Sequence, residues 1–107
     1  MTEAAKSQQV TTIATLLERY AAGKRDFTNA NLAHAQLQGV NLKGVDFSYA
    51  DLSQANLIKA DLRGSLLLGA NLRQAQLQDT KLEEADCDRN THFPEDFDLK
   101  SAGMKQK

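Results

Sequence analysis

Residues 50–74 read ADLSQANLIKADLRGSLLLGANLRQ, and a leucine recurs in this stretch at every fifth position. The same period extends in both directions without a break. A small residue stands two positions before most of the apolar centres, and Asp or Asn usually stands one position before. An internal repeat of this kind predicts an architecture of stacked, similar units. The thirteen centres are Phe27, Leu32, Leu37, Leu42, Phe47, Leu52, Leu57, Leu62, Leu67, Leu72, Leu77, Leu82 and Cys87.

A period of five fits neither of the regular secondary structures. Five residues advance an α-helix by about 140° beyond a full turn, so the centres would scatter around the helix. An odd period in a flat strand sends successive centres to opposite faces. A chain that bends sharply once per pentapeptide can turn every centre inward. Four bends close a square, so one coil takes about twenty residues and coils stack at roughly 4.8 Å.

The units at 30–34 (ANLAH), 50–54 (ADLSQ), 60–64 (ADLRG) and 70–74 (ANLRQ) resemble the repeats of pentapeptide repeat proteins. The resemblance covers residues 25–89 and implies an all-β solenoid, a right-handed quadrilateral β-helix of about three coils. Residues 16–27 and 90–98 are also similar to the leader and the ending of short cyanobacterial members. Five residues depart from the usual pattern: Gln36, Leu66, Gln76, Lys81 and Cys87.

The sequence divides into three parts. In residues 1–24, apolar residues at helical spacing predict a helix over about 8–22, with Ser7 as its N-cap and Gly23 as its end. We expect this helix to cap the open first coil. The alternative is a partner-binding or membrane-surface helix, and a polar face poor in Lys and Arg counts against a membrane.

Residues 25–89 form the predicted β-helix, and residues 90–107 follow it. Phe93 and Phe97 lie outside the repeat phase, and we expect them to cover the last coil. The polar end, residues 99–107, is predicted to be a mobile tail.

Few residues in the chain are suited to catalysis. His34 and His92 are more than fifty residues apart, and Cys87 occupies an inward position, where its thiol would be inert. Neither a phosphate-binding loop nor a metal-ligand spacing is present in the sequence. We therefore expect no enzymatic activity, no cofactor and no metal. The net charge of −1, the single Cys and the lack of a long apolar run indicate a cytoplasmic protein.

One unit carries extra leucines. In residues 65–69 (SLLLG) the centre is Leu67, so Leu66 and Leu68 should point outward, with Tyr49 one coil below and near Gly69. Tyr49, Leu66 and Leu68 are therefore the candidate partner-binding patch. Cover by a terminal segment, or incidental exposure, is the alternative.

These residues favour a non-catalytic protein-interaction or regulatory scaffold with an unidentified protein partner. The resemblance supplies a precedent, since some cyanobacterial members act in regulation, including heterocyst-related regulation, through protein contacts. It also supplies the alternative, a DNA mimic that acts on gyrase. Residues 25–89 hold nine acids and seven bases, so the predicted rod is short and nearly neutral. We expect a monomer, with a weak dimer as the alternative, and no binding to nucleic acid or membrane.

Overall fold

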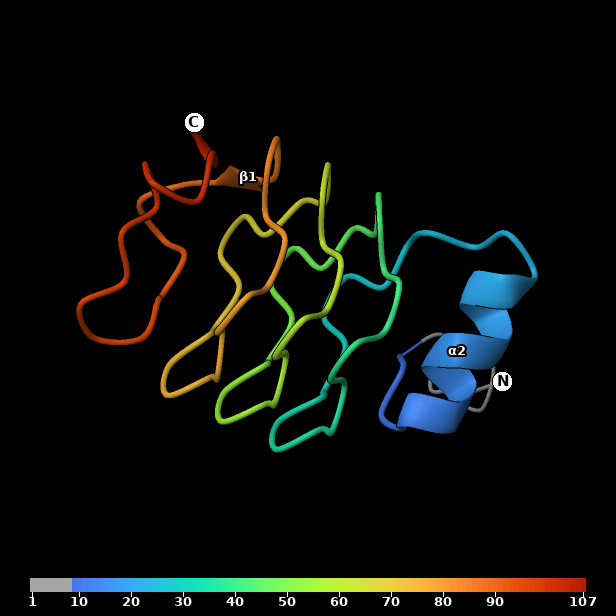
Figure 1. Cartoon of the computed structure of the whole chain (residues 1–107). Coiled ribbons are helices and arrows are strands. Elements are labelled where there is room, and N and C mark those ends of the chain that lie inside the picture. Colours follow the sequence, from blue (N-terminus) through green and yellow to red (C-terminus); the bar gives the residue numbers. More distant parts are fainter. Residues whose placement is uncertain (1–8) are drawn as a thin grey trace.

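The computed structural model of the chain describes residues 9–107, which form a short coil with one helix at its first end (Figure 1). Successive passes of the coil are joined by parallel bridges between positions twenty residues apart, such as Asp26–Asp46, Asp46–Leu66 and Leu66–Asp86. Four pentapeptides therefore make one turn, as the repeat period predicts. The Asn71–His92 bridge is the first to depart from this spacing, by one residue.

Each pentapeptide ends in a tight turn. The second residue after the centre has a positive φ in every unit from Asn29 to Glu84. The amide of the next unit's small residue donates to the carbonyl of the centre, as Ala50 N does to Phe47 O at 3.0 Å. This is the geometry of a type II turn, which requires φ > 0 at its third residue.

The repeated Asp and Asn residues stabilise these turns. Their side-chain oxygens accept the backbone N–H two residues later, as Asp46 Oδ1 does from Ser48 N at 3.0 Å. Asn41, Asn56, Asp61 and Asn71 make the same contact. The pattern of Asp and Asn in the sequence is therefore explained by local backbone bonding, without a metal or a catalytic pair.

The core is a column of the apolar centres. Most of them are fully buried, and the rings of Phe27 and Phe47, in successive coils, are tilted at 59° to each other with their centroids 6.2 Å apart. Leu77 is the exception, because it is only half-buried and packs at the edge of the core. The core thus runs along the axis of the coil and holds the side surfaces in a fixed geometry.

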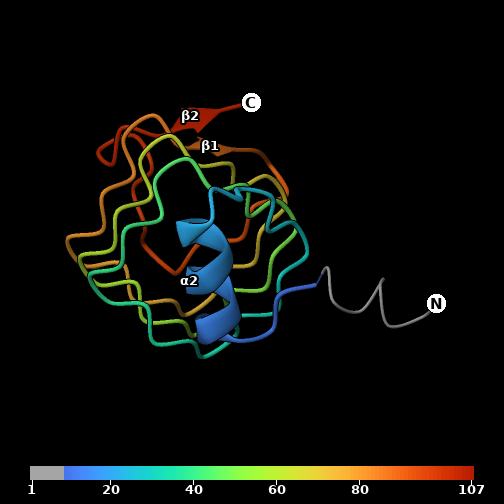
Figure 2. The same cartoon turned by 90° about the vertical axis from the view of Figure 1, so that its right-hand side faces the viewer.

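Helix α2 spans Ile13–Ala21 and lies across the open end of the first coil, as the view along the axis shows (Figure 2). The expected helix over 8–22 is too long. Val10 accepts a hydrogen bond from Asn31 N at 2.8 Å, so this part of the chain runs beneath the coil and the helix begins later. Thr12 is the N-cap, since its hydroxyl accepts from Thr15 N. Ser7, the expected cap, lies outside the described residues.

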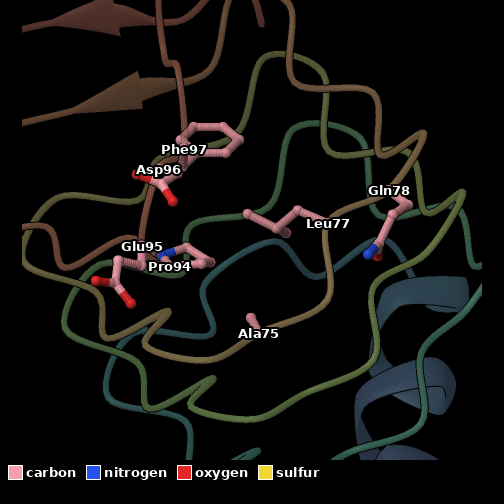
Figure 3. A pocket seen from close by; sticks show the side chains of 7 residues that line it. All are labelled: Ala75, Leu77, Gln78, Pro94, Glu95, Asp96 and Phe97. Carbon is pink, nitrogen blue, oxygen red and sulfur yellow. The ribbon is translucent and has the colours of Figure 1, made fainter.

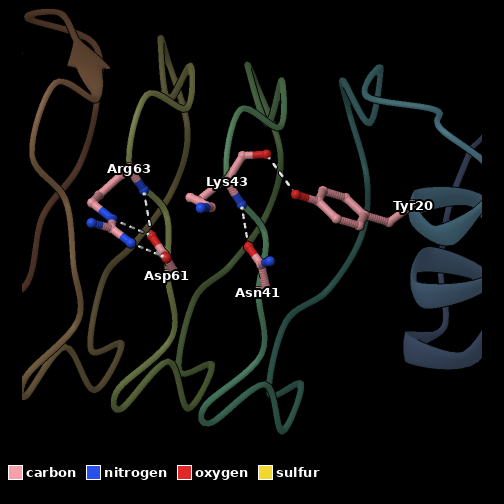
Figure 4. Close-up of polar contacts among 5 residues, drawn as sticks. All are labelled: Tyr20, Asn41, Lys43, Asp61 and Arg63. Carbon is pink, nitrogen blue, oxygen red and sulfur yellow. Dashed lines mark hydrogen bonds and ion pairs between the residues drawn. The ribbon is translucent and has the colours of Figure 1, made fainter.

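Leu16 faces the coil and is fully buried, whereas Leu17 is 39% exposed. The Tyr20 hydroxyl donates to Lys43 O at 2.7 Å and joins α2 to the side of the coil (Figure 4). Gly23 follows the helix with a positive φ, as expected for the residue that ends it. No helix within residues 9–107 is long and apolar enough to cross a membrane.

The C-terminal segment differs from the predicted mobile tail. Strand β1, Asp86–Cys87, pairs in parallel with β2, Lys105–Gln106. Met104 is buried, and Lys107 N donates to Cys87 O at 2.8 Å. Phe93 and Phe97 stack at 4.9 Å and pack against the core, both half-buried. Residues 99–107 thus extend the ladder of the coil, because their backbone groups find partners in β1.

Candidate protein-binding surface

Tyr49 is the most exposed large apolar side chain within residues 9–107, at 65%. It occupies the positive-φ position of its turn, with φ 62°. Its ring lies against Gly69, one coil further along, where a Cβ would come within 2.7 Å of Tyr49 Cδ1 and Cε1. A bulky residue in the left-handed region is uncommon and costs about 1–2 kcal/mol. Tyr49 is therefore a strained and solvent-facing aromatic residue.

Leu66 and Leu68 lie on the same side of the coil but are half-buried, so neither is as exposed as the sequence predicts. Leu66 is partly covered because it forms parallel backbone bridges with Asp46 on the coil before it and with Asp86 on the coil after it. The side chain of Leu66 has no hydrogen-bond acceptor, so Leu68 N lacks the side-chain partner that most of the other turns have. The structure brings Tyr49, Leu66 and Leu68 to one face, and we call these three residues the Tyr49 patch.

Carboxylates border the Tyr49 patch. Asp88 accepts hydrogen bonds from Gly69 N at 3.1 Å, from Asn90 N and from the Thr91 hydroxyl. Partial desolvation raises the pKa of Asp88, but these hydrogen bonds outweigh it, so the pKa is lower than usual. Asp86 forms an ion pair with Lys107 at 3.7 Å. The rim of the patch is thus charged and held in place, while its centre is apolar.

The contact between Tyr49 and Gly69 leads to a stability prediction. Gly64 and Gly69 have nearly the same positive φ, but a Cβ at Gly64 meets nothing within 4 Å. Both Gly64→Ala and Gly69→Ala should lose stability through backbone strain. Gly69→Ala should lose about 1 kcal/mol more, since the Tyr49 ring must move. Urea unfolding of the two variants measures the difference.

A second pair of variants isolates the ring. In a Tyr49→Gly background, Gly64→Ala and Gly69→Ala should cost the same free energy of unfolding, because no ring remains over Gly69. An equal cost in the presence of Tyr49 would contradict the packing described above.

Cys87 is fully buried and unpaired, and desolvation raises the pKa of its thiol above the usual value, with Asp88 and Asp86 adding to the shift. His34 is exposed on a turn, and His92 Nδ1 lies 3.2 Å from Arg73 Nη2. No cluster of three His, Cys, Asp or Glu residues able to hold a metal occurs within residues 9–107.

Asp61 is held by a neighbouring guanidinium. Arg63 Nε and Nη2 donate to the two oxygens of Asp61 at 2.9 and 2.7 Å, and this pairing lowers the pKa of Asp61 to about 2 (Figure 4). An ionised carboxylate held by a guanidinium serves poorly as a general acid or base near neutral pH. The arrangement is structural.

A hollow of about 270 Å³ lies at the far end of the coil from α2 (Figure 3). Ala75, Leu77 and Gln78 line one side, and the segment 94–97 lines the other. Leu77 points toward that segment (Figure 3). The repeat pattern did not predict this hollow, although Pro94 and the loss of the repeat after residue 89 were signals that the chain leaves the coil there.

Comparisons with known proteins agree with the repeat pattern. The sequence model of the family described as pentapeptide repeats matches residues 26–64 and 50–86, in eight copies. The chain belongs to the pentapeptide repeat family, so the prediction from its repeats is confirmed. The family consists generally of structural or interaction modules, and no catalytic family is indicated. Among curated proteins, no match was found.

Solved structures of cyanobacterial proteins are similar to the chain. The pentapeptide repeat protein alr5209 from Nostoc Pcc 7120 is 52% identical, with 92% of this chain and 98% of that one covered and a TM-score of 0.72. Rfr23 from Cyanothece 51142 is 32% identical over 64% of this chain and 46% of that one, with a TM-score of 0.63. Both neighbours are pentapeptide repeat proteins, which are known as right-handed β-helices.

Proposed function

We propose that the chain is a non-catalytic interaction module that presents the Tyr49 patch to a protein partner. The proposal rests on one observation, the 65% exposure of the Tyr49 side chain. The left-handed backbone is required by the turn and recurs in every unit from Asn29 to Glu84, but the turn does not require a large aromatic side chain at this position. The exposed ring is therefore not explained by the stability of the coil. Tyr is also among the residues that most often dominate protein interfaces.

The surroundings of Tyr49 support the same function. Gly69 leaves room for the ring to lie against the next coil, and Leu66 and Leu68 add apolar area beside it. The backbone beneath these residues is fixed by ladder bonds, such as Tyr49 N to Leu68 O at 2.9 Å. A partner would therefore meet a preformed surface and would order few side chains on binding.

The remaining parts of the proposal concern architecture and location. We infer a right-handed quadrilateral coil, from the solved relatives, with α2 and residues 90–107 as its two caps. We also propose the cytoplasm as its location, which suits a chain whose single cysteine is buried and unpaired. The DNA-mimic alternative remains disfavoured, because a net charge of −1 does not reproduce the dense charge of a duplex.

Site-specific crosslinking tests the proposal. Tyr49 is replaced by the photo-crosslinker p-benzoylphenylalanine, and Gln54 is replaced in a matched control. Gln54 occupies the same exposed, positive-φ turn position on the neighbouring unit. After irradiation in the native host, position 49 should give a discrete protein adduct that position 54 does not give. Equal adducts from both positions, or none from position 49, would refute the proposal.

A further inference from the structure

The last coil has an open backbone edge beside the hollow. One coil earlier, Leu57 N donates to Gln76 O and Lys59 N to Gln78 O, each at 3.0 Å, and Ala55 O accepts from Gln76 N at 2.9 Å. The equivalent groups on the next coil are Leu77 N, Asp79 N and Ala75 O. Within residues 9–107 none of these three groups has a hydrogen-bond partner.

The path of the C-terminal segment leaves this edge uncovered. The chain follows the ladder as far as His92, whose carbonyl accepts from Leu72 N at 2.6 Å. It then turns away through Pro94 and rejoins the coil at Gly103, which accepts from Glu84 N at 3.0 Å. Residues 94–97 therefore face Ala75, Leu77 and Gln78 across the hollow in place of bonding to them (Figure 3).

The unpaired groups define the strand that would complete the edge. It would run parallel to residues 75–79, as every coil does to its neighbour. One residue of this strand would donate to Ala75 O and accept from Leu77 N, and the residue two further on would accept from Asp79 N. The side chain between them would point inward, over Leu77, because centres in this register face the axis.

The lining of the hollow selects side chains for that strand. Leu77, Pro94 and Phe97 provide an apolar surface. The volume of about 270 Å³ is ample for one apolar side chain, since cavities of about 150 Å³ accept benzene. Asp79, Glu95 and Asp96 are exposed, and none of them forms an ion pair within the described part of the chain. Charge complementarity therefore favours basic residues on either side of the apolar one.

We propose that this open edge, Ala75–Asp79 with the segment 94–97, binds an extended protein segment by parallel strand addition, with the pattern basic–apolar–basic. Strand addition at an unpaired edge is a common mode of peptide recognition, in which backbone bonds provide affinity and a pocket provides specificity. The site is independent of the Tyr49 patch. A second copy of the chain could instead stack on the same edge, and the experiment below distinguishes it.

The probe is the acetylated and amidated peptide Gly-Thr-Lys-Leu-Lys-Thr-Gly, titrated into the full chain and followed by NMR. The amides of Leu77 and Asp79 should exchange rapidly in the free protein, while those of Leu57 and Lys59 are protected. Addition of the peptide should shift the Leu77 and Asp79 signals saturably and slow their exchange. The signals of Tyr49 should not change, which separates this test from that of the proposed function.

Two matched peptides test the mechanism. Methylation of the backbone amide nitrogen of the first Lys removes the donor to Ala75 O. Replacement of the central Leu by Ser removes the apolar side chain. Both should bind at least fivefold more weakly than the parent peptide. Absence of a saturable shift at roughly 1 mM parent peptide would overturn the proposal. Equal binding of the methylated peptide would also overturn it, as would protection of both amides by self-association of the free chain.

A variant tests the charged rim. Glu95→Gln with Asp96→Asn should weaken binding roughly twofold to fivefold at low salt, because two attractive charges are lost. Asn suits position 96, where φ is 64°. Glu18→Gln, on α2 at the opposite end, is the control and should leave the affinity unchanged. If the double variant binds like the wild type at low salt, the rim has no role and the basic–apolar–basic pattern is wrong.

Discussion

Removal of residues 1–22 is expected to make the chain self-associate. Val10 and Leu16 are buried against the first coil, and their loss would expose Phe27, Leu32, Leu37 and Leu42 to water at once. The deletion also frees Asn31 N, which is bonded to Val10 O. An apolar end with unpaired backbone groups is a template for pairing with another chain.

The effect is measured by sedimentation velocity and light scattering of the truncated chain. Deletion of residues 1–8 alone is the matched control and should leave the monomer intact, because the contacts named above begin at Val10. We expect a large shift of the 23–107 chain into oligomers or aggregates at concentrations where the control is monomeric. A folded and monomeric 23–107 chain would show that α2 is not a cap.

The coil itself could be predicted because its signal is local and repeated. Each centre, each small residue and each Asp or Asn has a role within its own pentapeptide, so the pattern could be read unit by unit. The structure shows which contact the acidic and amide residues make, since their side-chain oxygens accept from the backbone N–H two residues later. A period of five thus encodes both the packing and the turns.

The two ends could not be predicted equally well, because their structure depends on distant partners. The pairing of Val10 with Asn31 delays the start of α2, and nothing in residues 8–12 indicates that contact. Similarly, the polar sequence of residues 99–107 resembles a mobile tail. These residues are ordered because they pair with β1, where Lys105 lies opposite Asp86, nineteen residues earlier in the sequence.

The sequence predicted where the Tyr49 patch lies on the coil but not how exposed its leucines are. Stacking of units four apart placed Tyr49 near Gly69, as the structure has it. The exposure of Leu66 and Leu68 was overestimated, since a residue on the ladder is partly covered by the coils on both sides. The open edge at Ala75–Asp79 was missed, because it depends on where the chain leaves the coil after His92.

The double variant Leu66→Asn with Leu68→Ser is expected to fold normally and to lose partner binding. Asn at position 66 restores the turn contact that Asn56 and Asn71 make, and Ser occupies the equivalent of position 68 one coil earlier, at Ser48. The gained hydrogen bond offsets the lost apolar burial, so the free energy of unfolding should change by no more than about 1 kcal/mol. The apolar area beside Tyr49 is nevertheless removed.

The affinity of this double variant for the protein that crosslinks to position 49 is the most direct test of the Tyr49 patch. Ile58→Ser is the matched control, since Ile58 occupies the turn position equivalent to Leu68 on a different side of the coil and is also half-buried. We predict that the double variant binds at least about 30-fold more weakly, as loss of a hot spot would cause. The control should bind within about twofold of the wild type. Wild-type affinity in the double variant, with folding intact, would contradict the assignment of this face as the binding surface.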